Sequence, residues 1–408
     1  MTDAEPPTAL APPATGPLVE PGPALTTAQA ERYARHAILP GLGVEGQRRL
    51  LNAKVLVLGA GGLGSPVLMY LAAAGVGHLG IVDSDEVDLS NLQRQVIHSV
   101  DSIGRPKVDS AREALTRLDP DIRVTTFHGR LTAENALDVM QGWDIVVDGC
   151  DNFATRYLVA DACEILGIPC VWGSILRFDG QATTFWPGRG PVYRDIFPTP
   201  PDPRLVPSCA EAGVVGALCA AVGSVLAMEV VRLITGTGTN LVGRLLIHDA
   251  LAATWRELPL RPDPTRAPVT ELADYEALCS IPGAAGGGAA GGGGGDVTEL
   301  HTITAEELQI LLADREAGEQ QFTLVDVREP GEYDLVHIDG AVLIPKGEVI
   351  DDPARVPPGV PAVLYCKGGV RSAEALAALL ASGRDDVWHL DGGILSWIDR
   401  IEPHKPRY

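Results

Sequence analysis

The chain of 408 residues lacks the marks of a membrane protein and of a disulfide-stabilised secreted protein. It has no uninterrupted run of 18 or more apolar residues, so its hydropathy predicts no membrane-spanning segment and no membrane partner. Seven cysteines form no CxxC pair, which argues against a disulfide framework and gives no zinc-knuckle spacing. The first residues lack the basic start, apolar stretch and cleavage site of a signal peptide, so we expect a cytoplasmic protein.

Basic residues are also scarce. There are 32 Lys and Arg against 53 Asp and Glu, which gives a formal net charge of −21. Sequence-independent binding to nucleic acid needs clustered positive charge, so this composition excludes nucleic acid as an expected partner. The hydrophobic fraction of 46% is that of a globular protein with a sizeable core.

The order of apolar runs predicts an α/β fold. Residues 1–28 are rich in Pro, Ala and Thr without periodicity, so we expect a disordered tail there. The expected strands lie at 54–58, 79–83, 122–127, 144–148 and 169–173, separated by expected helices at 65–74, 106–118, 133–141 and 154–166. This alternation predicts a Rossmann-like, doubly wound and mostly parallel sheet. Residues 181–186 and 244–248 are expected as antiparallel additions beside a long helix at about 214–234.

A glycine-rich segment divides the chain. Residues 283–295 read GAAGGGAAGGGGG, which buries almost nothing and predicts a flexible linker. The expected organisation is therefore a first domain at 29–280, a linker at 281–297 and a second, smaller α/β domain at 298–408. In the second domain we expect helices at 302–314 and 373–380, and strands at 322–327, 362–365 and 387–390.

The first domain carries a nucleotide-type glycine loop. Gly59, Gly61, Gly62 and Gly64 follow a strand and open a helix, so backbone N–H groups and the helix N-terminus are aimed at an anion. Asp83 ends the next strand, where a carboxylate accepts hydrogen bonds from ribose hydroxyls. By fold analogy alone, an NAD-dependent oxidoreductase is one interpretation of this pattern.

The residues that follow favour a triphosphate over nicotinamide. Asn91, Arg94 and Lys107 place an amide, a guanidinium and an ammonium within about 25 residues of Asp83. The motif Asp148-Gly-Cys-Asp-Asn152 ends a further strand, at the edge where doubly wound sheets bind ligands. An acid beside phosphates can hold Mg²⁺.

Six segments together resemble a known family. RYARH, GAGGLGS, VDSDEVDLSNLQRQ, GRPK, DGCDN and SCAEAGV, within residues 29–260, are similar to the ubiquitin-activating-type adenylyltransferases of sulfur-carrier proteins, the molybdopterin-synthase and thiamine-pathway activators. The resemblance implies ATP and Mg²⁺ as cofactors. It also implies a homodimer, in which Arg35 of one copy reaches a phosphate bound by the other.

The resemblance also assigns the site residues. It implies that Gly62 and Asp83 contact the nucleotide and that Asn91, Arg94 and Lys107 surround its phosphates. Asp151 would orient Mg²⁺ or the phosphates. The neighbouring residues expected to support the site are Asp85, Gln95 and Asn152. Attack of a carboxylate on the α-phosphate needs positioned cations and no general base, because the carboxylate is already ionised.

One feature of the family is missing. Its members commonly bind a structural zinc through two CxxC pairs, at positions that here read PVYRD (191–195) and PDPTRAPV (262–269). Tetrahedral zinc needs four side-chain ligands, so we predict that no structural zinc is bound. We expect packing alone to hold this region.

Three segments of the second domain resemble a different family from that of the first domain. The segments 322–333, 337–345 and 391–397, within residues 299–404, resemble the rhodanese-homology domain. Its polar residues Asp326, Arg328, Glu332 and His337 lie near expected strand ends. We interpret these four as structural hydrogen-bonding residues.

Cys366 is the reactive candidate in the second domain. In the turn Cys366-Lys-Gly-Gly-Val-Arg371, two glycines let N–H groups point inward, the following helix adds its positive end, and Lys367 and Arg371 add charge. These features favour a thiolate or persulfide over a neutral thiol. The Cys-x4-Arg spacing is one residue shorter than the Cys-x5-Arg loop of phosphatases, so it suits a sulfur atom. The alternative is an inert core cysteine.

The two domains together predict one product, a protein thiocarboxylate. The C-terminal glycine of a ubiquitin-like sulfur carrier ending in Gly-Gly would be adenylated, and the Cys366 persulfide would attack it, as in the two-domain enzymes of molybdenum-cofactor biosynthesis that the chain resembles. The sulfur donor would be a cysteine desulfurase or thiosulfate. Cys209, which matches the family's second cysteine, would form a thioester, resolve an acyl disulfide or be structural. Alternatively, the second domain is only a docking or sensing module.

Overall fold

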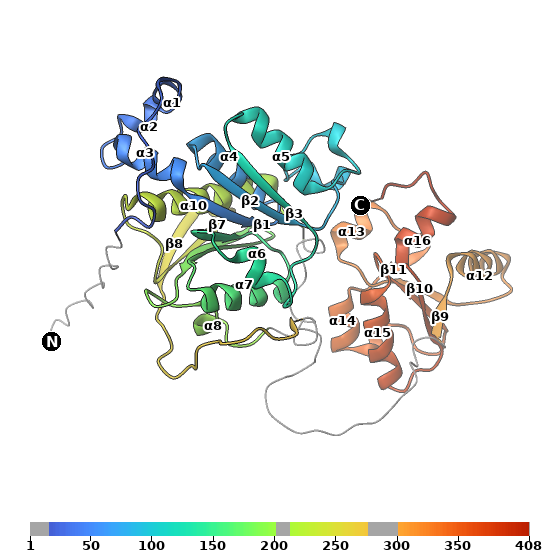
Figure 1. Cartoon of the computed structure of the whole chain (residues 1–408). Helices are drawn as coiled ribbons and strands as arrows, with labels where there is room; N and C mark the ends of the chain where they lie inside the picture. The colour runs from blue at the N-terminus through green and yellow to red at the C-terminus, as the bar shows by residue number, and fades with distance from the viewer. Residues whose placement is uncertain (1–15, 201–212, 276–300, 408) are drawn as a thin grey trace. The chain divides into compact units, whose positions relative to one another are not determined.

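The computed structural model describes residues 16–200, 213–275 and 301–407, drawn in colour in Figure 1. The chain divides into two compact units, Met1–Gly287 and Gly288–Tyr408. The first unit is built around an eight-stranded sheet, and the second around a five-stranded sheet.

The sheet of the first unit has the order β3-β2-β1-β4-β5-β6-β7-β8. Its first five members pair in parallel and the remaining pairs are antiparallel, which confirms the predicted α/β class. The strand β8 lies beyond those that the sequence predicts. The strands are β1 (Lys54–Leu58), β2 (His78–Asp83), β3 (Arg123–His128), β4 (Ile145–Asp148), β5 (Cys170–Leu176), β6 (Asp179–Phe185), β7 (Arg244–Asp249) and β8 (Thr254–Pro259).

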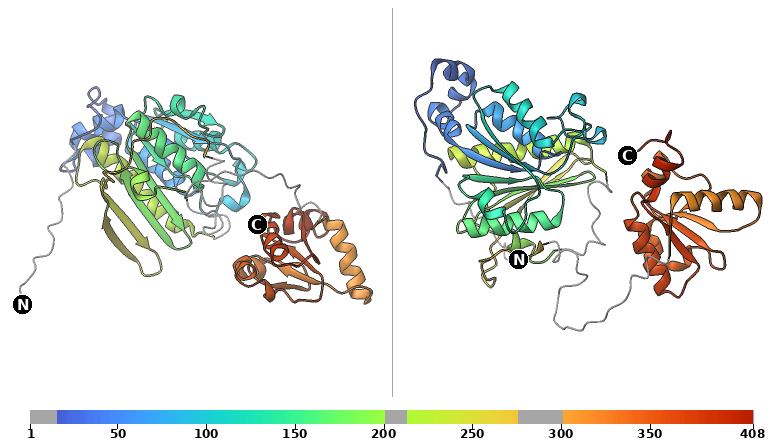
Figure 2. Two further views of the ribbon diagram at one scale, coloured as in Figure 1. Left: turned by 90° about the horizontal axis from the view of Figure 1, so that it is seen from below. Right: turned by 45° about the vertical axis from the view of Figure 1, so that its right-hand side comes forward.

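Helices cover both faces of this sheet (Figures 1 and 2). The side chains of α3, α4, α5 and α10 form a core on one face, and those of α6 and α7 form a core on the other. The helices are α1 (Thr27–Arg32), α2 (Ala34–Ala37), α3 (Gly43–Asn52), α4 (Gly64–Ala74), α5 (Lys107–Leu118), α6 (Ala136–Met140), α7 (Phe153–Leu166), α8 (Tyr193–Ile196) and α10 (Gly216–Thr235), with short 3₁₀ turns at Leu89–Asn91 and Val100–Ser102.

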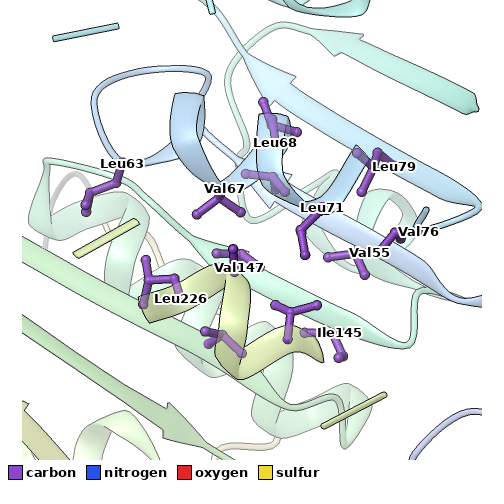
Figure 3. Close-up of a cluster of buried hydrophobic side chains, with 14 of the residues drawn as sticks. Val55, Leu63, Val67, Leu68, Leu71, Val76, Leu79, Ile145, Val147 and Leu226 are labelled. Carbon is purple, nitrogen blue, oxygen red and sulfur yellow. The ribbon is translucent and has the colours of Figure 1, made fainter. Parts of the chain in front are cut away.

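The central strand β1 shows why the sheet is buried on both sides. Val55 and Val57 belong to the core under α4 and α10, whereas Leu56 and Leu58 point to the opposite core. Successive side chains alternate across a strand, so a continuous apolar run fills both cores. Figure 3 shows the first of these cores, with Leu71 of α4 beside β1.

The helix α10 is long and apolar enough to cross a membrane by length and composition, but it lies in the core of the first unit. Over half of its most apolar window, 56%, is buried there. Its fully buried Glu229 accepts hydrogen bonds from Thr184 Oγ1 at 2.7 Å and from the backbone N–H of Leu241 at 2.6 Å. We therefore interpret α10 as a core helix that also anchors the antiparallel strands.

The sheet of the second unit is entirely parallel, with the order β11-β10-β12-β13-β9. Its α12 and α16 pack on one face, and α14 and α15 on the other. The elements are β9 (Thr302–Ile303), α12 (Ala305–Ala317), β10 (Thr323–Asp326), α13 (Pro330–Leu335), β11 (Ala341–Leu343), α14 (Lys346–Asp351), β12 (Ala362–Tyr365), α15 (Val370–Ala381), β13 (Val387–Leu390) and α16 (Gly393–Arg400), with a 3₁₀ turn at Pro353–Arg355.

The start of the second unit corrects a prediction. The sequence predicts helix from residue 302, but Thr302–Ile303 form a strand that pairs with β13. The helix begins after Thr304, whose side chain accepts a hydrogen bond from Glu307 N while the Glu307 carboxylate accepts one from Thr304 N. This capping box fixes the start of α12.

Buried charges connect the two segments that correspond to the zinc-binding segments of the family that the chain resembles. Arg266 Nε lies 2.8 Å from Asp195 Oδ1, and Arg266 Nη2 lies 2.8 Å from Glu164 Oε1. The expectation that packing alone holds this region was therefore wrong. A guanidinium presents its donors in a fixed fork, so one arginine can bridge carboxylates from α7 and α8.

We expect Arg266→Met to destabilise the first unit by about 2 to 3 kcal/mol. This is somewhat below the roughly 3–5 kcal/mol for breaking a fully buried pair, because the guanidinium keeps some exposure. The loss arises because Asp195 and Glu164 would stay buried without their partner. Urea unfolding of the full chain measures it, with the exposed Arg256→Met as the matched control. Equal midpoints for the two variants would contradict this account.

Candidate active sites

The first candidate site is a cavity of about 560 Å³ in the first unit. It lies at the carboxyl ends of β1, β2 and β4, which is where doubly wound sheets bind ligands. Most of the residues predicted to bind the nucleotide line it, namely Gly59, Gly61, Gly62, Asp83, Asp85, Arg94, Gln95, Lys107, Asp151 and Asn152.

The glycine loop is held by Asp83 and by its own geometry. Gly59 has a φ of +89°, which favours glycine, and a Cβ on Gly64 would lie only 1.8 Å from the Gly59 carbonyl oxygen. The carboxylate of Asp83 accepts hydrogen bonds from Ala60 N at 2.8 Å and from Asp85 N at 2.9 Å. Asp83 therefore shapes the loop as well as facing the cavity.

Cations and one buried amide face the same cavity. Lys107, almost fully buried, places Nζ 2.8 Å from Asp85 Oδ2. Arg94 donates from Nη1 to the carbonyl of Ser90 at 2.9 Å. Gln95 is buried, and its Oε1 has no hydrogen-bond partner among the described residues. A ligand group that donates a hydrogen bond would satisfy it.

Two other predicted residues, Asn91 and Arg35, do not line this cavity, and a third is not among the described residues. The side-chain oxygen of Asn91 accepts a hydrogen bond from Asp88 N at 3.2 Å, which closes a 3₁₀ turn outside the cavity lining. Arg35 is exposed on α2, also away from the lining. Cys209 lies outside the described residues. The roles predicted for these residues stay predictions.

The carboxylate of Asp151 and the amide of Asn152 follow β4 and lie at the N-terminus of α7. Asp151 is exposed, and Asn152 caps α7 by accepting a hydrogen bond from Thr155 N at 2.8 Å. Asp148, at the end of β4, is fully buried, and this burial raises its pKa. Asp151 is therefore the carboxylate of this motif that is accessible to a bound cation.

Sequence reasoning missed Arg156, which also lines the cavity. Its Nε and Nη2 donate to the carbonyl of Cys150 at 3.2 and 3.0 Å, and its guanidinium lies over the rings of Phe153 and Trp172. Arg156 thus fixes the turn that carries Asp151. In the sequence it is one arginine in a helical pattern, so nothing but the fold reveals this contact.

The imidazole of His98 supports the glycine loop from behind. Its Nε2 donates to the Ala60 carbonyl at 3.0 Å, so its Nδ1 accepts from Ser110 Oγ at 2.9 Å. Burial is the main cause that lowers the pKa of His98. The neutral ring is the form that makes both hydrogen bonds.

The second candidate site surrounds Cys366, at the turn between β12 and α15 in the second unit. Cys366 is only 1% exposed, and its Sγ accepts a hydrogen bond from Gly369 N at 3.1 Å. Gly369 has a φ of +97°, which lets this N–H turn inward. A Cβ on Gly393 would lie 2.4 Å from the Cys366 carbonyl oxygen, so a second glycine is needed beside the loop.

The charge of Arg371 is engaged within this site. Its Nη1 and Nη2 pair with the two oxygens of Glu332 at 2.7 and 2.8 Å, and both side chains are nearly buried. The sequence predicts that Arg371 adds positive charge near the thiol. In the structure Glu332 offsets much of that charge, while the Gly369 N–H and the N-terminus of α15 remain positive groups at the sulfur.

A buried serine lies beside the sulfur, and a buried histidine lies beside that serine. Ser372 Oγ is 3.5 Å from Cys366 Sγ and 3.3 Å from Nδ1 of His389. Nε2 of His389 is 3.1 Å from Thr302 Oγ1. Neither Ser372 nor His389 stands out in the sequence, because their positions on α15 and β13 do not separate them from other core positions.

Comparison with known proteins identifies both units. The model of the ThiF family matches residues 33–269, and that of the rhodanese-like domain matches residues 304–400. The chain is 51% identical over 398 residues to the probable adenylyltransferase/sulfurtransferase MoeZ of Mycobacterium tuberculosis, which covers 96% of this chain and 98% of that protein. It is 38% identical over 402 residues to the adenylyltransferase and sulfurtransferase MOCS3 of Drosophila sechellia, covering 94% of this chain and 86% of the other.

Two further comparisons concern the first unit. The sulfur carrier protein adenylyltransferase of Thermus thermophilus is 50% identical over 268 residues, covering 63% of this chain and 98% of that protein. The crystal structure of E. coli MccB with MccA-N7isoASN has a TM-score of 0.53 at 21% identity, covering 59% of this chain and 74% of the other. The second likeness bears on the fold alone.

The fold and the comparisons define an ATP-using ThiF-type domain joined to a rhodanese-like domain. The chain belongs to the ThiF family, within the two-domain adenylyltransferase/sulfurtransferases. It is an enzyme with both activities.

We expect Arg156→Lys to weaken Mg-ATP binding by about tenfold, because a point charge cannot hold the Cys150 carbonyl with two donors, and small displacements in a site have large effects. Equilibrium titration with Mg-ATP measures the Kd. Arg189→Lys, which changes an exposed arginine over Trp186, is the matched control and should leave the Kd unchanged. Wild-type affinity in Arg156→Lys would show that Arg156 does not position the site.

We expect part of the acid sensitivity of the first unit to come from His98. Its pKa is lowered in the folded state, so the unfolded state takes up the proton first, near pH 6.5, and stability falls as the pH drops below that value. We expect the free energy of unfolding to fall by about 1 kcal/mol between pH 7.5 and pH 5.5. The upper limit is roughly 1.4 kcal/mol, which applies to a histidine that stays unprotonated in the folded state.

Urea unfolding at both pH values tests this expectation. His98→Gln should reduce the difference between the two pH values, even if it lowers stability at both. The exposed His404→Gln should not change it. An unchanged difference in His98→Gln would mean that other groups cause the acid sensitivity.

Proposed function

We propose that the enzyme adenylates the C-terminal glycine of a ubiquitin-like sulfur-carrier protein ending in Gly-Gly and converts it to a thiocarboxylate. The observation that carries this proposal is the joining, in one chain, of a glycine-loop cavity with cationic residues and a cysteine held in a loop of inward N–H groups. Relatives named for sulfur carrier protein adenylylation and for sulfur transfer support it.

The first site suits the chemistry of adenylation. The carrier carboxylate attacks the α-phosphate of ATP, the bond to the β-phosphate breaks, and pyrophosphate leaves. Loop N–H groups, Arg94 and Lys107 would stabilise the charge that develops on the phosphate oxygens. The unpaired Oε1 of Gln95 fits a ligand seated against the loop, whose backbone turn is tight at Gly64.

We propose Asp151 as the protein ligand of Mg²⁺. No group of three His, Cys, Asp or Glu side chains in the described ranges is arranged to hold a metal ion. Mg²⁺ usually keeps several waters and binds through one or two carboxylates together with substrate phosphates, which fits a single exposed aspartate beside the cavity. The ion would neutralise phosphate charge there.

In the second half-reaction, the terminal sulfur of a Cys366 persulfide attacks the acyl carbon of the adenylate. A carbon–sulfur bond forms and AMP leaves. A thiol then cleaves the disulfide between Cys366 and the acyl sulfur, which releases the thiocarboxylate. Cys209 would supply that thiol or form a thioester with the carrier. A cysteine desulfurase or thiosulfate would reload Cys366.

The proposal also covers where the enzyme acts, its oligomeric state and its pathway. We propose that the enzyme acts in the cytoplasm, as a homodimer in which the exposed Arg35 of one copy completes the phosphate site of the other. We further propose molybdenum-cofactor biosynthesis or a related sulfur-containing pathway as its setting. The comparisons do not favour an NAD-dependent oxidoreductase or a rhodanese-like domain that only docks.

Intact-mass spectrometry of a carrier ending in Gly-Gly tests the proposal. With Mg-ATP, thiosulfate, a reductant and the enzyme, we expect the carrier to gain about 16 Da, sulfur in place of oxygen. Cys366→Ser should abolish the gain while ATP–pyrophosphate exchange continues. Cys163→Ser, which changes a buried cysteine of the first unit, is the control and should retain the gain. A gain that survives Cys366→Ser would exclude Cys366 as the sulfur carrier.

A further inference from the structure

A chain of polar side chains leads from the Cys366 sulfur to a buried imidazole. Ser372 is fully buried, and its Oγ lies 3.5 Å from Cys366 Sγ, 3.3 Å from His389 Nδ1 and 2.9 Å from the carbonyl of Gly369. His389 is 8% exposed, and its other ring nitrogen is 3.1 Å from Thr302 Oγ1. The chain thus runs across α15, β13 and β9.

The hydroxyl of Ser372 can form a hydrogen bond with either Cys366 or His389. It has one proton and can rotate to donate to the Gly369 carbonyl, to the sulfur or to the imidazole. When Nε2 of His389 carries the ring proton and donates it to Thr302, Nδ1 is an acceptor. The hydroxyl can then pass its own proton to Nδ1 while it takes one from the thiol.

The mechanism of sulfur loading needs such an acceptor. The thiolate, not the thiol, attacks a sulfane sulfur, so the proton of the Cys366 thiol must pass to an acceptor. Arg371 cannot take a proton, because a guanidinium is always charged. Through Ser372, hydrogen bonds connect the sulfur to His389, a titratable group.

We propose that His389 accepts the proton of the Cys366 thiol through the Ser372 hydroxyl. The S–H bond of Cys366 breaks and its proton moves to Ser372 Oγ, whose own proton moves to His389 Nδ1. The thiolate then attacks the outer sulfur of thiosulfate. A new S–S bond to Cys366 forms, the S–S bond of thiosulfate breaks, and sulfite leaves with the electron pair. No external oxidant is needed.

The surroundings of His389 suit this role. Burial is the main cause that lowers its pKa, so the ring is neutral and able to accept a proton near pH 7, and Asp391 acts in the opposite sense by favouring the imidazolium that forms. The two charged side chains of α15 are both paired, Arg371 with Glu332 of α13 and Glu374 with Lys346 of α14. The imidazolium and the thiolate would therefore stabilise each other across Ser372.

The inference rests on the proposed role of Cys366, and thiolate titration tests it separately from that role. Thiolate absorbance at about 240 nm is followed against pH in the full chain, and the spectrum of the matching Cys366→Ser protein is subtracted. We expect His389→Gln and Ser372→Ala each to raise the midpoint for Cys366 by about one pH unit, a roughly tenfold loss of thiolate near neutral pH.

The rate of sulfur loading gives a second readout. Mass spectrometry of the Cys366 peptide follows the gain of about 32 Da from thiosulfate. In both variants loading should slow roughly tenfold at pH 7 and approach the wild-type rate at alkaline pH, where the thiol ionises without help. A merely structural defect would slow it equally at every pH. His301→Gln changes a neighbouring histidine that contacts the Val387 carbonyl, and it should leave both readouts unchanged.

The outcomes separate the two hypotheses. If the titration midpoint and the pH dependence of loading are the same in wild type, His389→Gln and Ser372→Ala, the relay is wrong and the role of Cys366 stands. If wild-type Cys366 takes up no sulfur, its proposed role fails, while the titration midpoints still decide whether the relay exists. Ser372→Ala keeps the test valid if His389→Gln does not fold.

Discussion

Both candidate sites depend on the same constraint, a parallel strand that must turn tightly into a helix. After β1 the turn begins at Gly59, and after β12 it ends at Gly369, and both residues have the positive φ that side chains rarely allow. The turn directs backbone N–H groups and a helix N-terminus toward one point. In the first unit that point is the floor of a nucleotide-sized cavity, and in the second it is a sulfur atom.

The charged residues of the two sites act largely in pairs. Lys107 contacts Asp85, and Arg371 contacts Glu332 through both of its terminal nitrogens. Pairing keeps each cation ordered in a partly dry site, and the backbone then supplies much of the positive potential. Burial also decides which acids stay accessible, because Asp148 is buried within the sheet and Asp151, three residues on, is exposed.

Much of the fold could be predicted from the sequence. The continuous apolar run of β1 indicated a strand buried on both faces, and the structure places its alternate residues in two cores. Errors arose where local pattern is weak. The two-residue strand at Thr302 is too short to show a period, and β8 is exposed throughout, so its residues carry no apolar pattern.

The sequence by itself determined the two chemistries, because the glycine loop and the cysteine loop are local motifs whose backbone geometry follows from a few adjacent residues. Only the tertiary structure decided which other side chains act with them. Arg156 meets the Cys150 carbonyl, Arg266 joins two acids, and His389 reaches Cys366 through Ser372. Most of these contacts join residues on different elements, and strand order and helix packing, rather than any spacing along the chain, bring such residues within hydrogen-bond distance.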